Sequence, residues 1–147
     1  MKTAKVLLSA LIIAALIPGL ALAVEVVDAA VCEGVQEREP VNPGAAFPAD
    51  IGTVYCWSKI KDGDGAVVKH VYYYEGEEMA SVELAINSSL WRTHSSKRIP
   101  PSSTGKWRVD IVDAEGVVLR SIDFSIGEVV EPEPAPQEES SAEEQQQ

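Results

Sequence analysis

Two histidines are the first candidates for catalytic chemistry in this chain of 147 residues. His70 or His94 could form a Ser-His-Asp triad with Ser95 and Asp110, in which the histidine accepts the proton of the serine hydroxyl. No nucleophile-elbow sequence such as GxSxG is present, and serines are numerous enough for such trios to arise by chance. A hydrolase that uses His70 or His94 is therefore a minor hypothesis for this protein.

The two cysteines, Cys32 and Cys56, favour a disulfide. In a short chain that also carries an export signal, an even number of cysteines predicts pairing, here across a loop of 25 residues. Such a bridge stabilises a fold by roughly 3–4 kcal/mol. Cys56 shares its strand parity with Val54 and Ile60, so we expect the bridge to be buried. Lipidation of Cys32 is the alternative, but Val31 is larger than the residue that usually precedes a lipidated cysteine.

Metal and nucleotide sites are not predicted. The cysteines and histidines show no CxxC or HxxxH spacing, so the sequence does not indicate a zinc site. The turn at Asp62–Gly65 resembles the start of a calcium loop, but Tyr73 stands at position twelve, where an EF-hand requires glutamate. There is no glycine-rich phosphate loop either, and we expect the protein to need neither a metal nor a cofactor.

Basic and aromatic side chains gather in the segment WRTHSSKRIPPSSTGKWR, residues 91–108, which holds five of the twelve basic residues and no acidic one. Arginine matches carboxylates and phosphates, so a surface around this segment could accept an anion or an acidic sugar. The candidate binding residues are His70, Tyr72, Arg92, His94, Lys97 and Arg108. The alternative is a solvated sheet face, with the bases paired to Glu75, Glu77, Glu78 or Glu83 on neighbouring strands.

The charge of the whole chain argues against nucleic acid as a partner. The formal net charge is −11 and the sequence pI is near 4.5, whereas phosphate backbones attract basic surfaces. Without Lys2 and Lys5, and without the seven glutamates that begin at Glu128, residues 24–127 still carry a charge of −6. The basic segment therefore stands out against an acidic background.

Each end of the chain differs from the middle. Residues 1–23 have two lysines, an apolar run too short to span a membrane, and an Ala21-Leu22-Ala23 cleavage pattern, which together predict a signal peptide. We expect cleavage between Ala23 and Val24 and an exported, periplasmic or extracellular chain without a transmembrane helix. Residues 128–147 are rich in glutamate, proline and glutamine, a composition that predicts a disordered acidic tail.

The middle of the chain alternates apolar and polar residues and predicts a single all-β domain over residues 24–127. Seven strands at this spacing favour an antiparallel β-sandwich of immunoglobulin-like architecture. They are expected at Asp28–Val35, Thr53–Lys61, Val67–Tyr74, Met79–Asn87, Leu90–Ser96, Lys106–Val112 and Val117–Ile126. Within residues 106–112, Trp107 and Ile111 share the inward face. Arg120 has the parity of apolar residues in its own strand, which predicts a bulge or an arginine that reaches the rim.

Five segments of this domain together resemble a bacterial family. They are REPV (38–41), VYCW (54–57), KHVYYYEGEEMASVEL (69–84), WRTHSSKRI (91–99) and GKWRVDIVDAEGVVL (105–119). Their motifs and order are similar to domain-of-unknown-function family 2914, over about residues 31–124. That family has no assigned activity, so the resemblance implies a class of protein but no reaction. The residues that match its pattern are Arg38, Glu39, Pro40, His70, Trp91, Arg92, Ser95, Lys97, Gly105 and Trp107.

The sequence therefore supports three functional hypotheses. The first is an exported, non-catalytic binding module that holds an envelope glycan or protein through residues 91–108. The second is a structural domain that displays its acidic tail or scaffolds a complex, and the third is the hydrolase. Nothing in the composition specifies the ligand or the oligomeric state.

Overall fold

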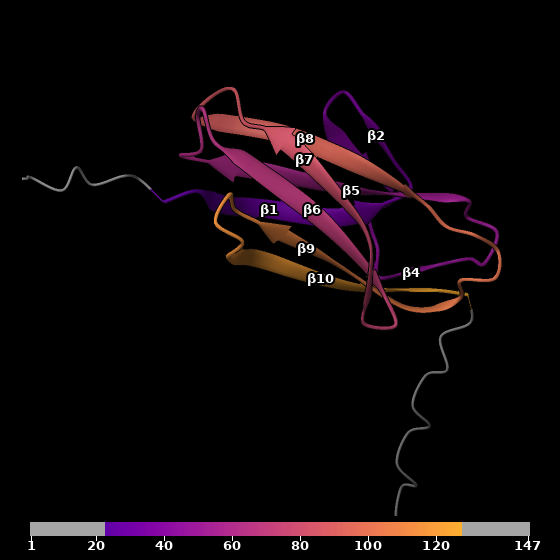
Figure 1. Ribbon diagram of the computed structural model, residues 1–147. Coiled ribbons are helices and arrows are strands. Elements are labelled where there is room, and N and C mark those ends of the chain that lie inside the picture. Colours follow the sequence, from indigo (N-terminus) through magenta and orange to yellow (C-terminus); the bar gives the residue numbers. More distant parts are fainter. Residues whose placement is uncertain (1–22, 128–147) are drawn as a thin grey trace, which may run out of the picture.

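The computed structural model describes residues 23–127, which form ten strands and no helix (Figure 1). The strands are β1 (Glu25–Cys32), β2 (Gly34–Gln36), β3 (Glu39–Val41), β4 (Ala46–Phe47), β5 (Thr53–Lys61), β6 (Val67–Tyr74), β7 (Glu77–Ala85), β8 (Leu90–Arg98), β9 (Gly105–Val112) and β10 (Val118–Ile126). The all-β class is confirmed. The expected signal peptide and acidic tail lie outside the described residues. Within residues 23–127, no helix is long and apolar enough to cross a membrane.

Ten strands rather than seven form because the expected first strand ends early and three short strands were missed. β1 ends at Cys32, and after Glu33 the chain forms the small β2–β3 hairpin. β4 has two residues and pairs in parallel with β10. Strands this short carry too few residues for an alternating pattern to be recognised.

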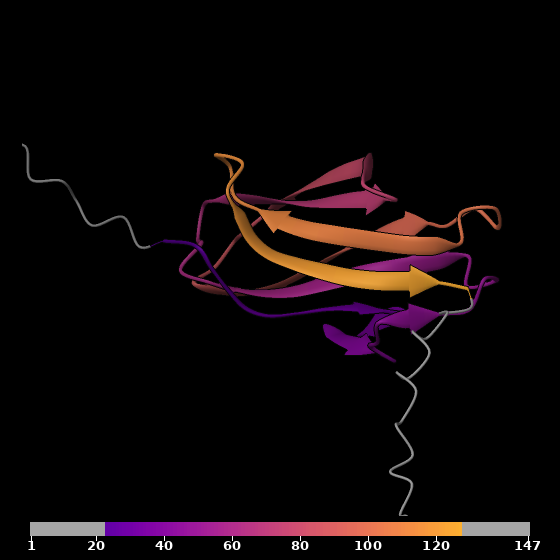
Figure 2. The ribbon, with the colours of Figure 1, turned by 90° about the horizontal axis from the view of Figure 1, so that it is seen from below.

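The strands belong to two larger sheets and one hairpin. The first sheet has the order β1-β5-β8, the second has the order β4-β10-β9-β6-β7, and β2-β3 stands alone. Figure 2 shows the larger sheets as layers, with the hairpin beside the first sheet. One cluster of buried apolar side chains draws from β1, β5, β6, β9 and β10, so the two sheets enclose a common core.

Alternation sorts the side chains as the sequence predicts. Trp107 and Ile111 of β9 are buried in the core, as expected for inward-facing positions. The β9–β10 register shifts between Val118 and Arg120, which confirms the bulge. The guanidinium of Arg120 donates a hydrogen bond of 3.1 Å to the carbonyl of Val26, and the arginine therefore leaves the core.

The expected disulfide is not formed, and both cysteines are buried free thiols. The β1–β5 register places Val31 opposite Cys56, and Cys32 opposite Tyr55. Residues opposite each other in an antiparallel pair share a face, so Cys32 and Cys56 lie on opposite faces of the same sheet. Burial raises the pKa of both thiols, and the other cysteine adds to the rise at Cys56. The two cysteines in the sequence predicted a disulfide, but the β1–β5 register places their side chains on opposite faces of the sheet.

Candidate functional site

A buried polar chain crosses the core between the two sheets. The Ser58 hydroxyl lies 3.1 Å from Nε2 of His70, and the Ser95 hydroxyl lies 2.7 Å from Nδ1 of the same ring. The Tyr72 hydroxyl lies 2.6 Å from that of Ser95. β5 supplies Ser58, β8 supplies Ser95, and β6 supplies His70 and Tyr72, so the chain joins the sheets through side chains that face inward.

The side chains of this polar chain are buried and hydrogen-bond to one another. His70, Tyr72 and Ser58 are fully buried, and Ser95 is 6% exposed. Burial lowers the pKa of His70 to about 4, with a smaller contribution from His94, so the imidazole is neutral at pH 7. A neutral imidazole has one donor and one acceptor, and the two serines occupy both. The Ser95 hydroxyl is thus hydrogen-bonded on the inside of the fold.

The Ser-His-Asp triad considered from the sequence is not assembled. Asp110 pairs with Val71 in the β6–β9 register, whereas His70 pairs with Ile111, so the two side chains lie on opposite faces of the sheet. Asp110 accepts hydrogen bonds from Ser121 at 2.6 Å and from Arg108 at 3.0 Å instead. The Ser95–His70 pair therefore has no orienting carboxylate.

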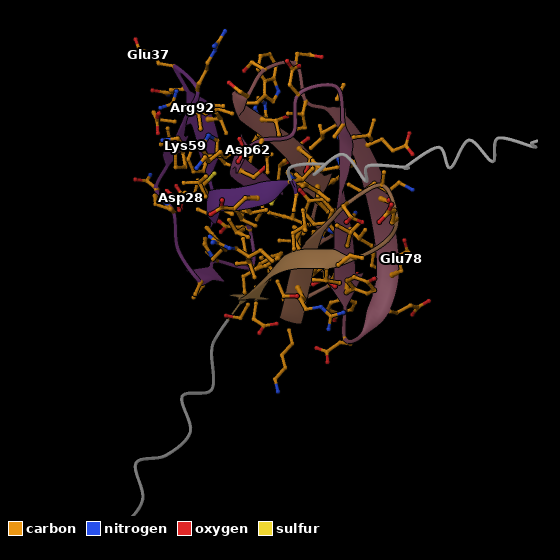
Figure 3. All side chains as sticks on the ribbon, turned by 90° about the vertical axis from the view of Figure 1, so that its left-hand side faces the viewer. Asp28, Glu37, Lys59, Asp62, Glu78 and Arg92 are labelled. Atoms are coloured by element: carbon orange, nitrogen blue, oxygen red, sulfur yellow. The ribbon has the colours of Figure 1, made fainter. Side chains whose placement is uncertain are left out.

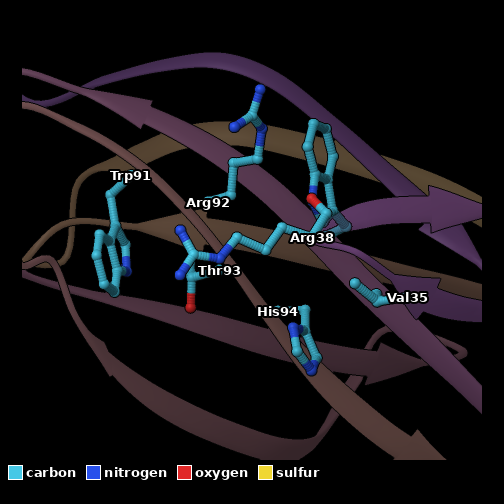
Figure 4. Close-up of a pocket in the computed structure, with 7 residues that line it drawn as sticks. Val35, Arg38, Trp91, Arg92, Thr93 and His94 are labelled. Carbon is cyan, nitrogen blue, oxygen red and sulfur yellow. The ribbon is translucent and has the colours of Figure 1, made fainter.

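A pocket of about 320 Å³ opens on the other side of β8, where the β2–β3 hairpin lies over the first sheet. We call it the hairpin pocket; it is lined by Val35, Arg38, Trp57, Trp91, Arg92, Thr93 and His94. Figure 4 shows Arg38 extending from the hairpin toward Thr93, with Trp91 and His94 on either side. Arg92 and His94 are exposed, and their parity in β8 directs them to the outer face of the sheet.

Local contacts hold the arginines of the hairpin pocket in place. Arg92 Nε lies 2.9 Å from Glu39 Oε1 of the hairpin, and the indole N–H of Trp57 donates to the carbonyl of Arg38 at 2.8 Å. Among the described residues, no carboxylate forms an ion pair with Arg38. Two guanidinium groups therefore share the pocket with one carboxylate, and an anion can be held there by charge-assisted hydrogen bonds.

The hairpin that carries Arg38 has a strained turn. Glu37 and Arg38 are its two central residues, with φ values of 50° and 65°. Two-residue hairpin turns of this kind usually use asparagine and glycine, because other residues resist positive φ. Arg38 matches the family pattern, but the expected binding site did not include it. The turn lacks the asparagine and glycine that would have predicted a hairpin, and Trp57, whose indole binds the Arg38 carbonyl, is far from it in the sequence.

The six residues expected to bind a ligand do not form one surface. Arg92 and His94 line the hairpin pocket, whereas His70 and Tyr72 are in the core. Burial also raises the pKa of the Tyr72 hydroxyl above its ordinary value, an effect that nearby Cys56 adds to.

The remaining two expected residues lie at other places. The Lys97 ammonium lies 5.9 Å from the ring centroid of Trp107 and donates to the carbonyl of Arg98 at 2.8 Å. The guanidinium of Arg108 lies 4.3 Å from the ring centroid of Tyr73, on the outer face of the second sheet. The acid partners of the arginines are Glu39 and Asp110, not the glutamates of residues 75–83.

Figure 3 shows where labelled charged side chains lie. Arg92 and Lys59, which are opposite each other in the β5–β8 register, lie on one side of the molecule together with Glu37 and Asp28, and Glu78 lies on the other. Within residues 23–127, no group of three or more His, Cys, Asp or Glu side chains is arranged to hold a metal ion. The chemistry of the hairpin pocket is therefore that of arginine, histidine and aromatic rings.

Comparison with known proteins gives one family. Residues 66–126 match the family described as "Protein of unknown function (DUF2914)", and no curated protein matches the chain. One similar solved structure is an endonuclease/exonuclease/phosphatase from Beutenbergia cavernae DSM 12333, with 16% identity and a TM-score of 0.30. The match covers 71% of this chain and 35% of that one, and at this TM-score it carries no argument. Residues 66–126 thus match the family that the motifs in β6, β8 and β9 predicted, the DUF2914 family of proteins of unknown function.

Proposed function

We propose that this protein is an exported, non-catalytic binding module that holds an anionic partner of the cell envelope, a carboxylate-bearing glycan, in the hairpin pocket. The observation that carries the proposal is the convergence of Arg38, Arg92 and His94 beside aromatic rings. Arginine forks recognise carboxylates in a bidentate manner, and an aromatic wall suits a sugar ring. The strain at Glu37 and Arg38 supports this assignment, because strained backbone is retained most often where function requires it.

A non-catalytic role fits the polar chain in the core. The Ser95 hydroxyl is hydrogen-bonded to His70 and Tyr72 on the inside of the fold, away from the hairpin pocket. A catalytic serine has to reach its substrate, and its histidine is normally oriented by a further group such as a carboxylate. The hydrogen bonds of Ser95 support a role in stability instead.

The strand order supports an immunoglobulin-like β-sandwich as the architecture of this module. With the main strands taken in chain order, one sheet contains the first, second and fifth, and the other contains the third, fourth, sixth and seventh. This division is that of immunoglobulin sheets, with an extra strand beside the third and no fourth strand in the first sheet. β4 adds in parallel to the last strand.

The second candidate is a structural domain that displays its acidic tail. It is favoured by the internal contacts of several residues of the family pattern. The indole of Trp107 donates to the carbonyl of Ser103 at 2.9 Å, and Gly105 has φ of 120°. A side chain at Gly105 would meet Glu75 Oε1 at 2.5 Å. Such contacts account for those positions without a ligand, but they do not account for Arg38.

Titration with trigalacturonate, an acidic oligosaccharide, tests the binding proposal. We expect the backbone amide resonances of Arg38, Arg92 and His94 to shift in a saturable manner, and the shifts to weaken as salt is raised, because exposed charges are screened. The resonances around Arg108 serve as the internal control and should not move. Saturable shifts around Arg108 with none at the hairpin pocket would contradict the proposed site.

A further inference from the structure

The open edges of the two larger sheets differ in charge. β1 carries Glu25 and Asp28, β7 carries three glutamates, and neither of these two edge strands contains an arginine or a lysine. β8, which pairs with β5 alone among the described strands, carries Arg92, Lys97 and Arg98 and no acid. An unpaired strand edge is a template for another extended segment, and the charge of β8 selects an acidic one.

The hydrogen-bond pattern shows which backbone groups of β8 are free. Ile99 N donates to Gly52 O, and Asp62 N donates to Ser89 O, both at 2.9 Å. These pairs continue the β5–β8 register at either end, so odd-numbered residues of β8 direct their N–H and C=O groups toward β5. Even-numbered residues therefore direct theirs toward the open edge. Their side chains, which include those of Arg92, His94 and Arg98, are all exposed.

Part of the sequence after Gly127 has a proline at every second position, which matches the two-residue repeat of a strand edge. In EPEPAPQEE, residues 131–139, the prolines occupy positions 132, 134 and 136 only. In a strand with this sequence, every odd-numbered residue has a backbone N–H, and these groups all point to one edge. On the other edge, residues 132, 134 and 136 have no N–H, because they are prolines. Glu131, Glu133 and Glu139 are on the donor-bearing parity. Such a segment can pair on one side and resists the addition of a further strand.

We propose that residues 131–139 of the chain add to the open edge of β8 as an antiparallel strand. Odd-numbered residues of the segment would face even-numbered residues of β8, and opposed residues share a face. Glu131, Glu133 and Glu139 thereby lie on the same face as Arg92, His94 and Arg98. The segment then covers part of the hairpin pocket and competes with its external ligand, and in this respect alone the inference rests on the proposed function.

The course of the chain permits this pairing. Gly127 N donates to the carbonyl of Phe47 at 2.9 Å, and a side chain at Gly127 would contact Ala49. Ala49 and Arg98 line one pocket, and Figure 1 shows that β8 and β10 end on the same side of the molecule, so the chain leaves the fold at the end where β8 finishes. The twenty residues that follow can span about 66 Å when extended, whereas β8 from Arg98 back to Arg92 covers about 20 Å.

Amide hydrogen exchange tests the pairing directly. In the full chain, the amides of Arg92, His94 and Arg98 should exchange about tenfold more slowly than in a variant that ends at Gly127, if the segment is bound about 90% of the time. The amides of Thr93 and Ser95, which face β5, should exchange equally in both. Equal exchange of the even-numbered amides in the two proteins would overturn the proposal.

Two proline variants of the full chain provide a matched pair. Ala135→Pro removes a donor on the odd-numbered edge and should abolish the protection, whereas Glu138→Pro places a proline on the even-numbered edge and should keep it. Equal behaviour of the two variants would contradict the predicted parity. Protection that rises with protein concentration would also overturn the proposal, because it assigns the segment to a second copy.

The outcome for the proposed function can be separated from this test. If the segment competes for the pocket, trigalacturonate should bind more tightly to the variant that ends at Gly127. Binding of trigalacturonate without any difference in exchange would refute the segment's pairing and leave the proposed function standing. Protected amides with no trigalacturonate binding in either protein would refute the glycan and leave the pairing standing.

Discussion

Replacing Ser95 with alanine is expected to lower the free energy of unfolding by about 3 kcal/mol, since each buried polar group left without a partner costs about 1–3 kcal/mol. The change removes the hydroxyl that lies 2.7 Å from His70 Nδ1 and 2.6 Å from the Tyr72 hydroxyl. Urea denaturation measures the effect as a lower transition midpoint with an unchanged slope.

Ser96→Ala is the matched control for Ser95→Ala. Ser96 is the next residue of β8, but its side chain is exposed, so its loss should change stability by about 0.5 kcal/mol at most. If both alanine variants unfold at the same urea concentration, the polar chain does not contribute to stability, and the structural role given to Ser95 is wrong.

Acidification is the second change with a large expected effect. The pKa of His70 is lowered to about 4 in the folded state, from an ordinary value of 6.5, mainly by burial. Between these values the unfolded chain binds a proton that the folded chain does not, so stability is present above pH 6.5 and is lost as the pH falls toward 4. The loss approaches about 3 kcal/mol, at 1.36 kcal/mol per unit of pKa.

The two histidines provide the comparison that tests this pH dependence. Urea midpoints measured between pH 6.5 and pH 5 avoid most of the carboxylate titration. His94→Gln should keep most of the pH dependence of stability, because burial lowers the pKa of His70 more than His94 does, and His70→Gln should reduce it. If His94→Gln removes the dependence and His70→Gln preserves it, the burial of a neutral His70 is not its cause.

The strands of the core could be predicted because their side chains alternate strictly. β5 and β6 begin and end at the expected residues, and the bulge before Arg120 follows from a charged residue with core parity. The absence of a disulfide could not be predicted from the alternation of side chains within a strand. Whether Cys32 and Cys56 share a face depends on the β1–β5 register, which the spacing of two cysteines does not specify.

The candidate site was predicted in part, and the missing part has a physical reason. Arg92 and His94 alternate outward in β8, which the sequence shows. Their partners Arg38 and Trp57 come from a hairpin and a strand that only the folded chain brings beside β8. The hairpin turn at Glu37 and Arg38 has no asparagine or glycine, so its positive φ values gave no signal in the sequence.

The basic segment 91–108 is explained by the same structure. Its acid-free β8 leaves an edge whose free backbone groups and exposed arginines are on the same residues. Lys97 and Arg108 have partners of their own in Trp107 and Asp110. The concentration of charge that made this segment stand out is therefore divided between internal contacts and one exposed surface.

The central claim is that the hairpin pocket binds anions, and the affinity for trigalacturonate of two arginine variants tests it most directly. Arg92 and Arg108 each form an ion pair with one carboxylate, but only Arg92 lines the hairpin pocket. Arg92→Gln should weaken binding by about tenfold, the loss of one hydrogen bond from a charged group, while Arg108→Gln should leave the affinity within about twofold. Equal losses in the two variants, or a larger loss for Arg108→Gln, would contradict the account.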